Sequence, residues 1–358
     1  MKVCWLTNYY SPYKMNVAEL IGKEVELTMF MIGGKEDKNR NDEWILKQDR
    51  SFKVVLIDKD FNSTINKLAV ENDILIDSMY ATSYGIKAVH YFRKNKKKTV
   101  LLADGGLAIN RGFIIDKLLS IIMKRHDYFF SSSKYTDDYF KYYKVDDHLI
   151  YHYNFFSLSK KDLIENEELF KKKEELRKEL NIDDKFTFIS VGQPIVRKGF
   201  DILLNAYIKS GLIEKANIYI VGGKPQKEIQ DIVDKNNLTN VHFIDLITSK
   251  ELKKYYGMAD AFILTTRYDI WGLVINEAMS FGLKVITSNK CVAGLHFSDL
   301  SPDVLLSDVL DIDTYSEHMQ NLFNGYNRVS NINLNIIKEY SIENNAKGIV
   351  NNLNAIIN

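Results

Sequence analysis

The feature that most constrains the fold is an alternation of short apolar runs with amphipathic segments of helical period along most of the chain. Such an alternation predicts parallel sheets with helices on both faces. The expected strands are 3–7, 25–32, 54–57, 74–76, 99–103, 128–131, 186–191, 218–221, 241–244, 261–264 and 284–287. The expected helices include 83–95, 113–125, 200–209, 227–235, 250–258 and 273–281.

The 358 residues are too many for one core, because single cores stop growing near ~250–300 residues. A charged stretch at 157–181 interrupts the alternation and predicts a domain junction with an exposed helix that buries little. We therefore expect an α/β protein with two Rossmann-like parallel-sheet domains, 1–155 and 156–340. A helix at 341–358 should pack back toward the first domain. Ligands of open parallel sheets bind beyond the carboxyl ends of the strands, so the site is expected in the cleft between the domains.

Composition excludes several classes of protein. Basic and acidic residues balance at 48 to 47, whereas a nucleic-acid binder would show a basic excess. The two cysteines are far apart in sequence, which indicates a reducing compartment and no disulfide framework. The first residues hold only a short apolar run, and no stretch approaches the ~18 apolar residues of a membrane span. These features favour a cytoplasmic protein.

The most informative segment is 265–289, where a polar loop follows an expected strand and a helix begins near Gly272. The first amides of a helix have no partner within it, so those of Gly272, Leu273 and Val274 would form an anion site.

Two carboxylates flank this expected helix start. Glu277 lies five residues into the helix, roughly 7 Å along its axis, which suits a diphosphate at the helix end and a ribose hydroxyl beside the carboxylate. Asp269 precedes the helix, where a sugar on the distal phosphate would lie. The alternative makes Glu277 a solvated helix residue and Asp269 a capping or turn residue.

A second unit of strand, loop and helix places Arg197, Lys198 and Gly199 at the same sheet edge. Two cations there would neutralise a diphosphate and stabilise its departure. The alternative is a Lys-Gly helix entry with solvated charges. The segment is not a Walker A loop, because Lys198 precedes Gly199 and no Ser or Thr follows in the required place.

These motifs resemble the retaining glycosyltransferases of family 4, also called glycosyl transferases group 1, which have the GT-B fold. Residues 191–201 resemble the family's V-G-R-x-x-x-R-K-G-x-D segment, and 221–223 its glycine turn after the next strand. Residues 269–279 are similar to its E-x7-E signature, with Asp in the first place. The string 266–277 and the first loop, 8–14, resemble a bacterial polysaccharide-assembly branch.

The resemblance implies that the first domain binds an acceptor and the second a nucleotide sugar. Lys198 would bind the donor diphosphate with Arg197 nearby, Glu277 the donor ribose, and Asp269 the transferred sugar. The backbone amides at the start of the helix would hold phosphate.

The remaining donor-side positions are implied in the same way. Gly223 belongs to the glycine turn, and the loop of Leu246, Ile247 and Thr248 would face the base. Gln193 stands where many members carry Arg, so one phosphate contact is either lost or supplied by Arg197.

On the acceptor side, Tyr13 belongs to the first loop. Asp104, Gly105 and Gly106 lie about where the family has a cleft histidine, with different chemistry. Asp104 would either orient the acceptor or form a turn.

The implied activity is retaining transfer from a nucleotide sugar, a UDP-sugar being favoured. The acceptor would be a glycan or lipid-linked glycan in surface polysaccharide biosynthesis. No metal, no other cofactor and no nucleic acid would take part. One alternative is a non-catalytic relative that binds a glycan or a partner transferase. Another is a nucleotide-sugar epimerase of similar architecture.

Residues 113–125 form an apolar helix with a basic end, next in sequence to the basic run 93–98. We expect this helix to pack in the core. The alternative is a membrane-facing helix that holds the protein peripherally at anionic lipid on the inner face of the membrane.

Overall fold

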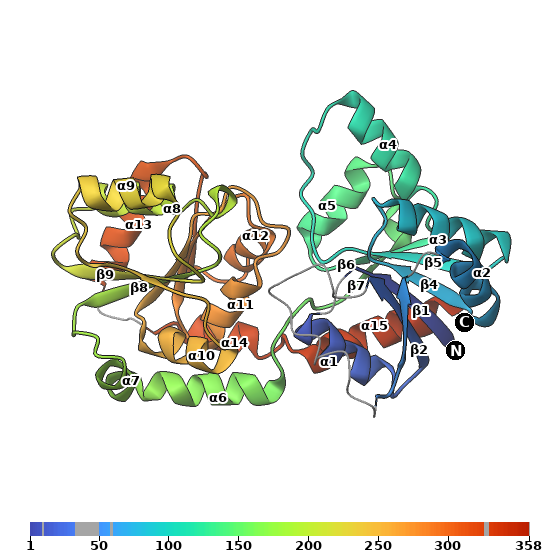
Figure 1. The fold of residues 1–358 in the computed structure, drawn as a ribbon, viewed down its shortest axis with the longest axis horizontal. Helices are drawn as coiled ribbons and strands as arrows, with labels where there is room; N and C mark the ends of the chain where they lie inside the picture. Colours follow the sequence, from blue (N-terminus) through green and yellow to red (C-terminus); the bar gives the residue numbers. More distant parts are fainter. Residues whose placement is uncertain (9–10, 33–49, 58–59, 326–328, 358) are drawn as a thin grey trace. The chain divides into compact units, whose positions relative to one another are not determined.

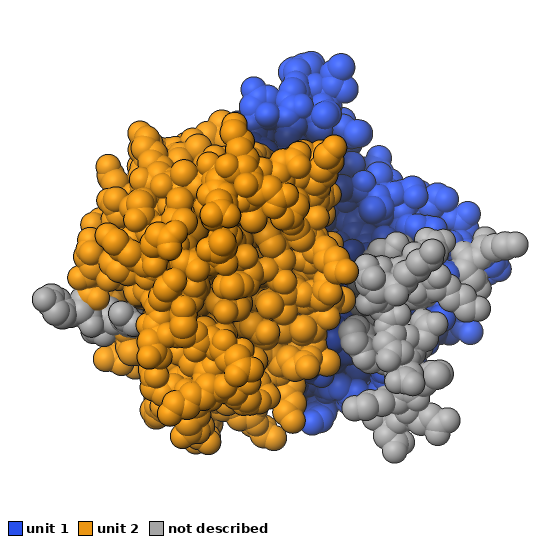
Figure 2. Space-filling model, turned by 60° about the vertical axis from the view of Figure 1, so that its left-hand side comes forward, with its two compact units in different colours: residues 1–157, 340–358 blue, residues 158–339 orange. Residues whose placement is uncertain are grey.

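The computed structural model describes residues 1–8, 11–32, 50–57, 60–325 and 329–357. The chain divides into two compact units, each with its own parallel sheet (Figure 1). Unit 1 comprises Met1–Ser157 and Tyr340–Asn358, and unit 2 comprises Leu158–Glu339, as coloured in Figure 2. The expected α/β class with two parallel sheets is confirmed, and Tyr9 and Tyr10 of the first-loop motif lie outside the described residues.

Unit 1 holds a seven-stranded sheet in the order β3-β2-β1-β4-β5-β6-β7. Its strands are β1 (Lys2–Thr7), β2 (Glu26–Ile32), β3 (Lys53–Ile57), β4 (Ile74–Asp77), β5 (Lys98–Leu102), β6 (Tyr128–Ser131) and β7 (Ile150–His152). Its helices are α1 (Pro12–Ile21), α2 (Phe61–Glu71), α3 (Ser83–Lys94), α4 (Phe113–Met123), α5 (Lys134–Tyr142) and α15 (Ile342–Ile357). The last helix packs against α1, so the end of the described chain belongs to unit 1.

Unit 2 holds a six-stranded sheet in the order β10-β9-β8-β11-β12-β13. Its strands are β8 (Phe186–Val191), β9 (Ala216–Val221), β10 (Val241–Ile244), β11 (Ala261–Leu264), β12 (Lys284–Ser288) and β13 (Val304–Ser307). Its helices are α6 (Lys160–Lys171), α7 (Lys173–Glu179), α8 (Phe200–Lys209), α9 (Lys227–Lys235), α10 (Ser249–Met258), α11 (Leu273–Ser280), α12 (Val292–Ser298), α13 (Ile312–Asn324) and α14 (Asn331–Ile337).

The strand order of unit 2 explains where a ligand can approach it. The order reverses between β8 and β11, which are adjacent in the sheet but far apart in sequence. Loops that leave neighbouring strands in opposite directions open a crevice at such a switch point. The loops after β8 and β11 are those that carry the candidate donor-side residues.

Most residues of the stretch 157–181 are exposed or partly exposed, as expected, and unit 2 begins in it at Leu158. A few of its side chains are nevertheless buried, because α6 and α7 pack against α10. Asn166 donates to Ser280 at 2.8 Å, and the buried Arg177 binds the carboxylate of Asp260. These two polar side chains thus find partners inside unit 2.

The helix expected in the core, α4, instead leaves several of its large apolar side chains exposed. One side of α4 packs against the core of unit 1, whereas the apolar side chains on its other side have no core to pack into. None of the helices within the described ranges is both long and apolar enough to cross a membrane.

Candidate functional site

Backbone and side-chain bonds join the loops after β8 and β11. Arg267 donates from its backbone amide to the Arg197 carbonyl at 2.8 Å. Its guanidinium forms two bonds to the Asp201 carboxylate, at 2.8 and 2.6 Å. The Thr265 hydroxyl donates to the Gly199 carbonyl at 2.7 Å. These bonds fix the segment with Arg197 and Lys198 against the segment with Asp269.

The cationic groups and Asp269 meet at this junction. Lys198 Nζ lies 2.7 Å from Asp269 Oδ2, and Arg197 Nη1 lies 3.3 Å from the same oxygen. The side chains of Lys198 and Asp269 are largely buried, whereas that of Arg197 is exposed. A Cβ added at Gly192 would lie 3.1 Å from Lys198 Cε, so this glycine leaves room for the lysine chain. Lys198, Arg197 and Asp269 thus form one charged site, and its two cations can bind a diphosphate.

The helix after this loop begins where the sequence predicts. Gly272 is the residue before α11, with a left-handed φ of 103°. A Cβ on Gly272 would lie 2.5 Å from Cys291 Sγ, so glycine is required both by the backbone and by the space. The alternative that Asp269 caps this helix is wrong, because Gly272 occupies the capping position. Amides of the first turn, including Leu273 and Val274, are the donors that an anion would use.

Glu277 lies on α11 and is partly exposed. The hydroxyl of the buried Tyr256 donates to Glu277 Oε2 at 2.9 Å. Burial raises the pKa of Glu277 to about 7, opposed by the Tyr256 hydrogen bond and by the charge of Lys253. Glu277 is therefore not an ordinary solvated helix residue, since its carboxyl group has a defined partner and an altered pKa.

The other expected donor-side residues lie on the loops after β8, β9 and β10. Gln193 and Leu246 are exposed, and Gly223 is partly exposed. Ile247 precedes Thr248, whose hydroxyl and backbone amide form a capping box with Glu251 at the start of α10. The structure thus gives Thr248 a helix-capping role, and its contact with a base stays a prediction.

The acceptor-side candidates lie in unit 1, after β5. Asp104 is partly exposed, and it receives long hydrogen bonds, each 3.4 Å, from the hydroxyls of Tyr13 and Tyr153. Gly105 and Gly106 are buried, and a Cβ on Gly106 would lie 2.5 Å from the Tyr139 ring. The structure brings Tyr13 and Asp104 together, whereas their role toward an acceptor stays a prediction.

Sequence reasoning missed Arg267 and Tyr256. Neither belongs to a motif that was singled out for its side-chain chemistry, and Tyr256 is separated from Glu277 by 21 residues. The one usable signal was that Arg267 stands in the loop before Asp269, beside a strand end. Within the described ranges no three His, Cys, Asp or Glu side chains gather as a metal site requires, and metal-independent chemistry stays a prediction.

Replacing Gly199 with alanine is expected to lower the free energy of unfolding of unit 2 by about 3 kcal/mol. Gly199 has a left-handed φ of 70°, and a Cβ there would clash with the carbonyl oxygen of Thr265. Gly211 is the matched control, because its φ of 67° is similar but a Cβ would meet nothing within 4 Å. Gly211→Ala should therefore cost only about 1 kcal/mol. Urea unfolding followed by circular dichroism measures both, and equal losses would contradict the clash.

Comparisons with known proteins agree with the fold. Residues 172–339 match the family model of glycosyl transferases group 1. An O-antigen biosynthesis glycosyltransferase, WclY of Escherichia coli, is 29% identical over 189 residues, which cover 46% of this chain and 49% of WclY. An uncharacterized 41.2 kDa protein in the cps region of Klebsiella pneumoniae is 31% identical over 106 residues, covering 30% of this chain and 28% of that protein. The chain thus spans half or less of the length of these curated relatives.

Among solved structures, Anabaena Alr3699/HepE in complex with UDP and glucose superposes with a TM-score of 0.77. The superposition covers 99% of this chain and 100% of that one at 13% identity, a level at which the likeness shows the fold. The GT-B architecture expected from the resemblance is confirmed. The family match lies entirely within unit 2. It includes Arg197, Lys198 and Asp269, the charged residues at the junction of the loops after β8 and β11.

Proposed function

We propose that this chain transfers a sugar from a nucleotide-sugar donor to a glycan or lipid-linked glycan acceptor. The match of residues 172–339 to the family model of glycosyl transferases group 1 supports this proposal. The observation that carries the proposal is the pairing of Lys198 with Asp269 at the switch point of the unit 2 sheet. The likeness to WclY, named for O-antigen biosynthesis, supports a role in the synthesis of surface polysaccharide.

The proposed roles follow from the chemistry of each group. Lys198 and Arg197 provide positive charge for a diphosphate, and the amides at the start of α11 provide hydrogen bonds. Glu277 accepts hydrogen bonds from the ribose hydroxyls. Asp269, released from Lys198, accepts hydrogen bonds from the hydroxyls of the transferred sugar. A UDP-sugar is the favoured donor, since HepE, which has the same fold, binds UDP and glucose in its structure.

The proposed reaction retains the configuration of the sugar. The bond between the anomeric carbon and the donor phosphate oxygen breaks, and a bond from the acceptor oxygen forms on the same face. The acceptor proton passes to a phosphate oxygen of the leaving diphosphate. The protein positions the two substrates and stabilises negative charge on the leaving group. In enzymes, one hydrogen-bond donor that stabilises such charge typically lowers the activation free energy by about 2.7–4 kcal/mol. A lipid-linked acceptor would place the protein peripherally at the inner face of a membrane.

Thermal unfolding with UDP, GDP and ADP tests the donor site. One nucleotide, expected to be UDP, should stabilise the protein by about 2.7 kcal/mol at ~100 times its dissociation constant. The Lys198→Ala variant should lose most of that stabilisation. If none of the three nucleotides stabilises the wild type, the proposal fails, and the chain is better explained as a non-catalytic relative that binds a glycan or a partner protein.

A further inference from the structure

Helix α4 exposes a continuous apolar strip. Phe113 and Ile114 are 79% and 80% exposed, and Leu118 and Ile121 about half exposed. Residues three, four and seven positions apart share one side of a helix, so these four side chains lie on one side, together with the exposed Lys117. We call these five residues the α4 surface. Contiguous exposed apolar residues of this size mark an interaction site more often than chance.

The opposite side of α4 is held firmly to unit 1. Met123 is fully buried, and Leu119 packs against the same hydrophobic cluster. Asp116 accepts hydrogen bonds from the hydroxyls of Tyr142 and Tyr143, at 2.9 and 3.0 Å. The α4 surface is therefore the outer side of an ordered helix, with its inner side already satisfied.

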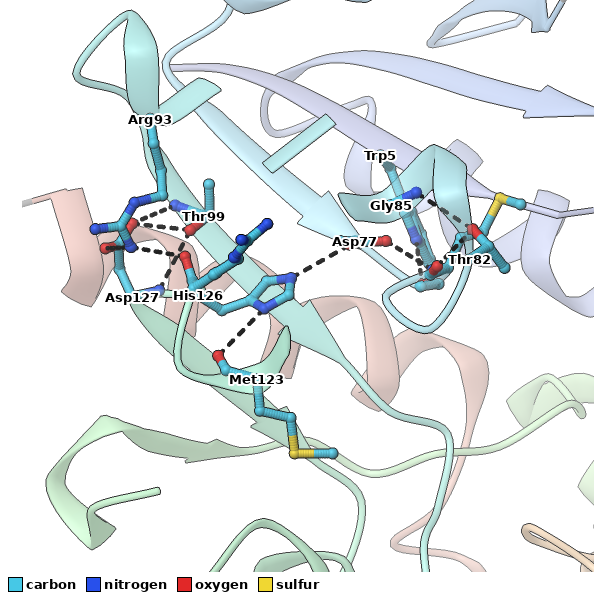
Figure 3. A network of polar contacts seen from close by, with 12 residues as sticks. Trp5, Asp77, Thr82, Gly85, Arg93, Thr99, Met123, His126 and Asp127 are labelled. Atoms are coloured by element: carbon cyan, nitrogen blue, oxygen red, sulfur yellow. Dashed lines mark hydrogen bonds and ion pairs between the residues drawn. The ribbon is translucent and has the colours of Figure 1, made fainter. Parts of the chain in front are cut away.

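A buried polar network fixes the end of this helix (Figure 3). His126, just beyond α4, lies 3.2 Å from Asp77 Oδ2 at the end of β4 and 3.4 Å from the Met123 carbonyl oxygen. In the same view Asp127 accepts from the amide and the hydroxyl of Thr99, each at 2.9 Å. These bonds join the end of α4 to β4 and β5.

Positive charge from two elements gathers at this end of α4. Arg93, at the end of α3, donates to the Arg125 carbonyl at 2.7 Å, so the basic run 93–98 lies beside the basic end of α4. The exposed cations of this basic cluster are Arg93, Lys94, Lys96, Lys124 and Arg125. The carboxylates of Asp116, on α4, and of Asp127, just after it, already have partners. Asp127 contacts Thr99 and Arg93, and Asp116 accepts from the two tyrosines.

We propose that the α4 surface and the basic cluster dock the protein on an anionic lipid bilayer, with α4 lying in the plane of the headgroups. Its 11 residues span roughly 16 Å, far less than the ~30 Å of a hydrocarbon core, so α4 lies on the membrane and does not cross it. The apolar residues enter the headgroup and acyl boundary, while the cations contact lipid phosphates. A protein partner or a second copy would need acidic groups facing this basic cluster, whereas an anionic bilayer supplies them at every position.

Flotation of the purified protein with vesicles tests the proposal without any sugar donor, so its outcome is independent of the proposed activity. We expect binding to vesicles of phosphatidylcholine with phosphatidylglycerol to be at least ~10-fold stronger than to phosphatidylcholine alone, and to weaken with salt. Leu118→Asp should reduce binding at least ~10-fold, because it removes an exposed apolar side chain that would enter the lipid and adds a negative charge. Replacing Lys124 and Arg125 together by glutamine should reduce binding to the anionic vesicles by roughly 10-fold or more, at about 1 kcal/mol per cation.

Val70→Asp is the matched control, since Val70 is 60% exposed on α2 of the same unit. It should bind vesicles as the wild type does, and the thermal unfolding of all variants should match the wild type within the effect of a surface substitution. The proposal is overturned if wild type does not float with the anionic vesicles, or if Leu118→Asp and Val70→Asp bind equally. Light scattering adds a second check. If the wild type self-associates but does not bind vesicles, and Leu118→Asp abolishes the self-association, the α4 surface binds a second copy of the chain and the proposal is overturned.

Discussion

Lys198→Ala is expected to lower kcat/KM for sugar transfer by about 100- to 1,000-fold, the usual cost of losing one group that stabilises charge in a transition state. Lys198 Nζ is the largely buried cation at the junction of the loops after β8 and β11, 2.7 Å from Asp269. Negative charge grows on the diphosphate as the glycosidic bond to it breaks, and a fixed ammonium group beside it stabilises that charge most at the transition state. The measurement is transfer of radiolabelled sugar from the nucleotide sugar that stabilises the protein.

The fold should survive this change, because Asp269 keeps Arg197 at 3.3 Å and remains open to water on one side. Lys209→Ala is the matched control, since Lys209 is an exposed lysine on α8 whose partner, Asp313, is also exposed. It should retain full activity. A loss of less than about tenfold in Lys198→Ala, with normal unfolding, would remove Lys198 from the proposed mechanism.

Glu277→Gln is expected to remove a pH dependence of stability. Burial raises the pKa of Glu277 from 4.5 to about 7 in the folded protein, so the folded state holds this proton at pH values where the unfolded state has lost it. The free energy of unfolding should therefore fall as the pH rises from about 4.5 to about 7, by up to about 3 kcal/mol, and level off above. In Glu277→Gln this contribution disappears, and the difference between the two curves, from urea unfolding at several pH values, isolates it.

The affinity for the nucleotide should also depend on the protonation of Glu277, but it should rise with pH where the stability falls. The carboxylate accepts ribose hydroxyls better than the protonated acid does, so affinity for the nucleotide should rise as the pH passes about 7. Glu277→Gln should bind more weakly and lose this rise, whereas the titration of the nucleotide's own phosphate remains in both proteins. Calorimetry at pH 6 and pH 8 measures it, the two values being chosen on either side of the pKa of about 7.

Tyr256→Phe tests the hydrogen bond to Glu277 while leaving the Glu277 carboxyl group in place. The variant removes the hydroxyl that donates to Glu277 Oε2, so the pKa of Glu277 should rise further and nucleotide affinity should fall. Tyr255→Phe is the control, because Tyr255 packs against Tyr219 on the neighbouring side of α10. If the pH dependence of stability and of nucleotide affinity persists unchanged in Glu277→Gln, a group other than Glu277 causes it.

The elements that sequence predicted best are those decided by local patterning. Every strand expected from a short apolar run is present, and α11 begins directly after Gly272, the glycine expected to mark its start. The sequence also placed the loops of Lys198 and Asp269 on one sheet edge, because parallel strands put the loops at their carboxyl ends together. It did not predict the ion pair between these two side chains. Strand β13 was not predicted, since its apolar run is only three residues long, Val304 to Leu306.

The features that sequence missed depend on packing between distant segments. Nothing local distinguishes the buried apolar residues of α4 from its exposed ones, because an apolar helix has the same pattern in a core and on a membrane surface. Most of the stretch 157–181 is exposed or partly exposed, as its charges indicated, but nothing in the sequence relates the buried Arg177 to its partner Asp260, 83 residues away. The bonds of Arg267 and Tyr256 likewise join segments that the sequence does not relate.

The contact between Lys198 and Asp269 also bears on how selective the proposed donor site would be. A simple anion that takes the lysine would leave the carboxylate without its closest partner, and that loss would offset much of the gain. A ligand that brings an anion for one group and hydroxyls for the other satisfies both at once. The nucleotide and the sugar of the donor would thus bind cooperatively. The nucleotide left after transfer would bind more weakly than the nucleotide sugar, because the ion pair between Lys198 and Asp269 competes with it.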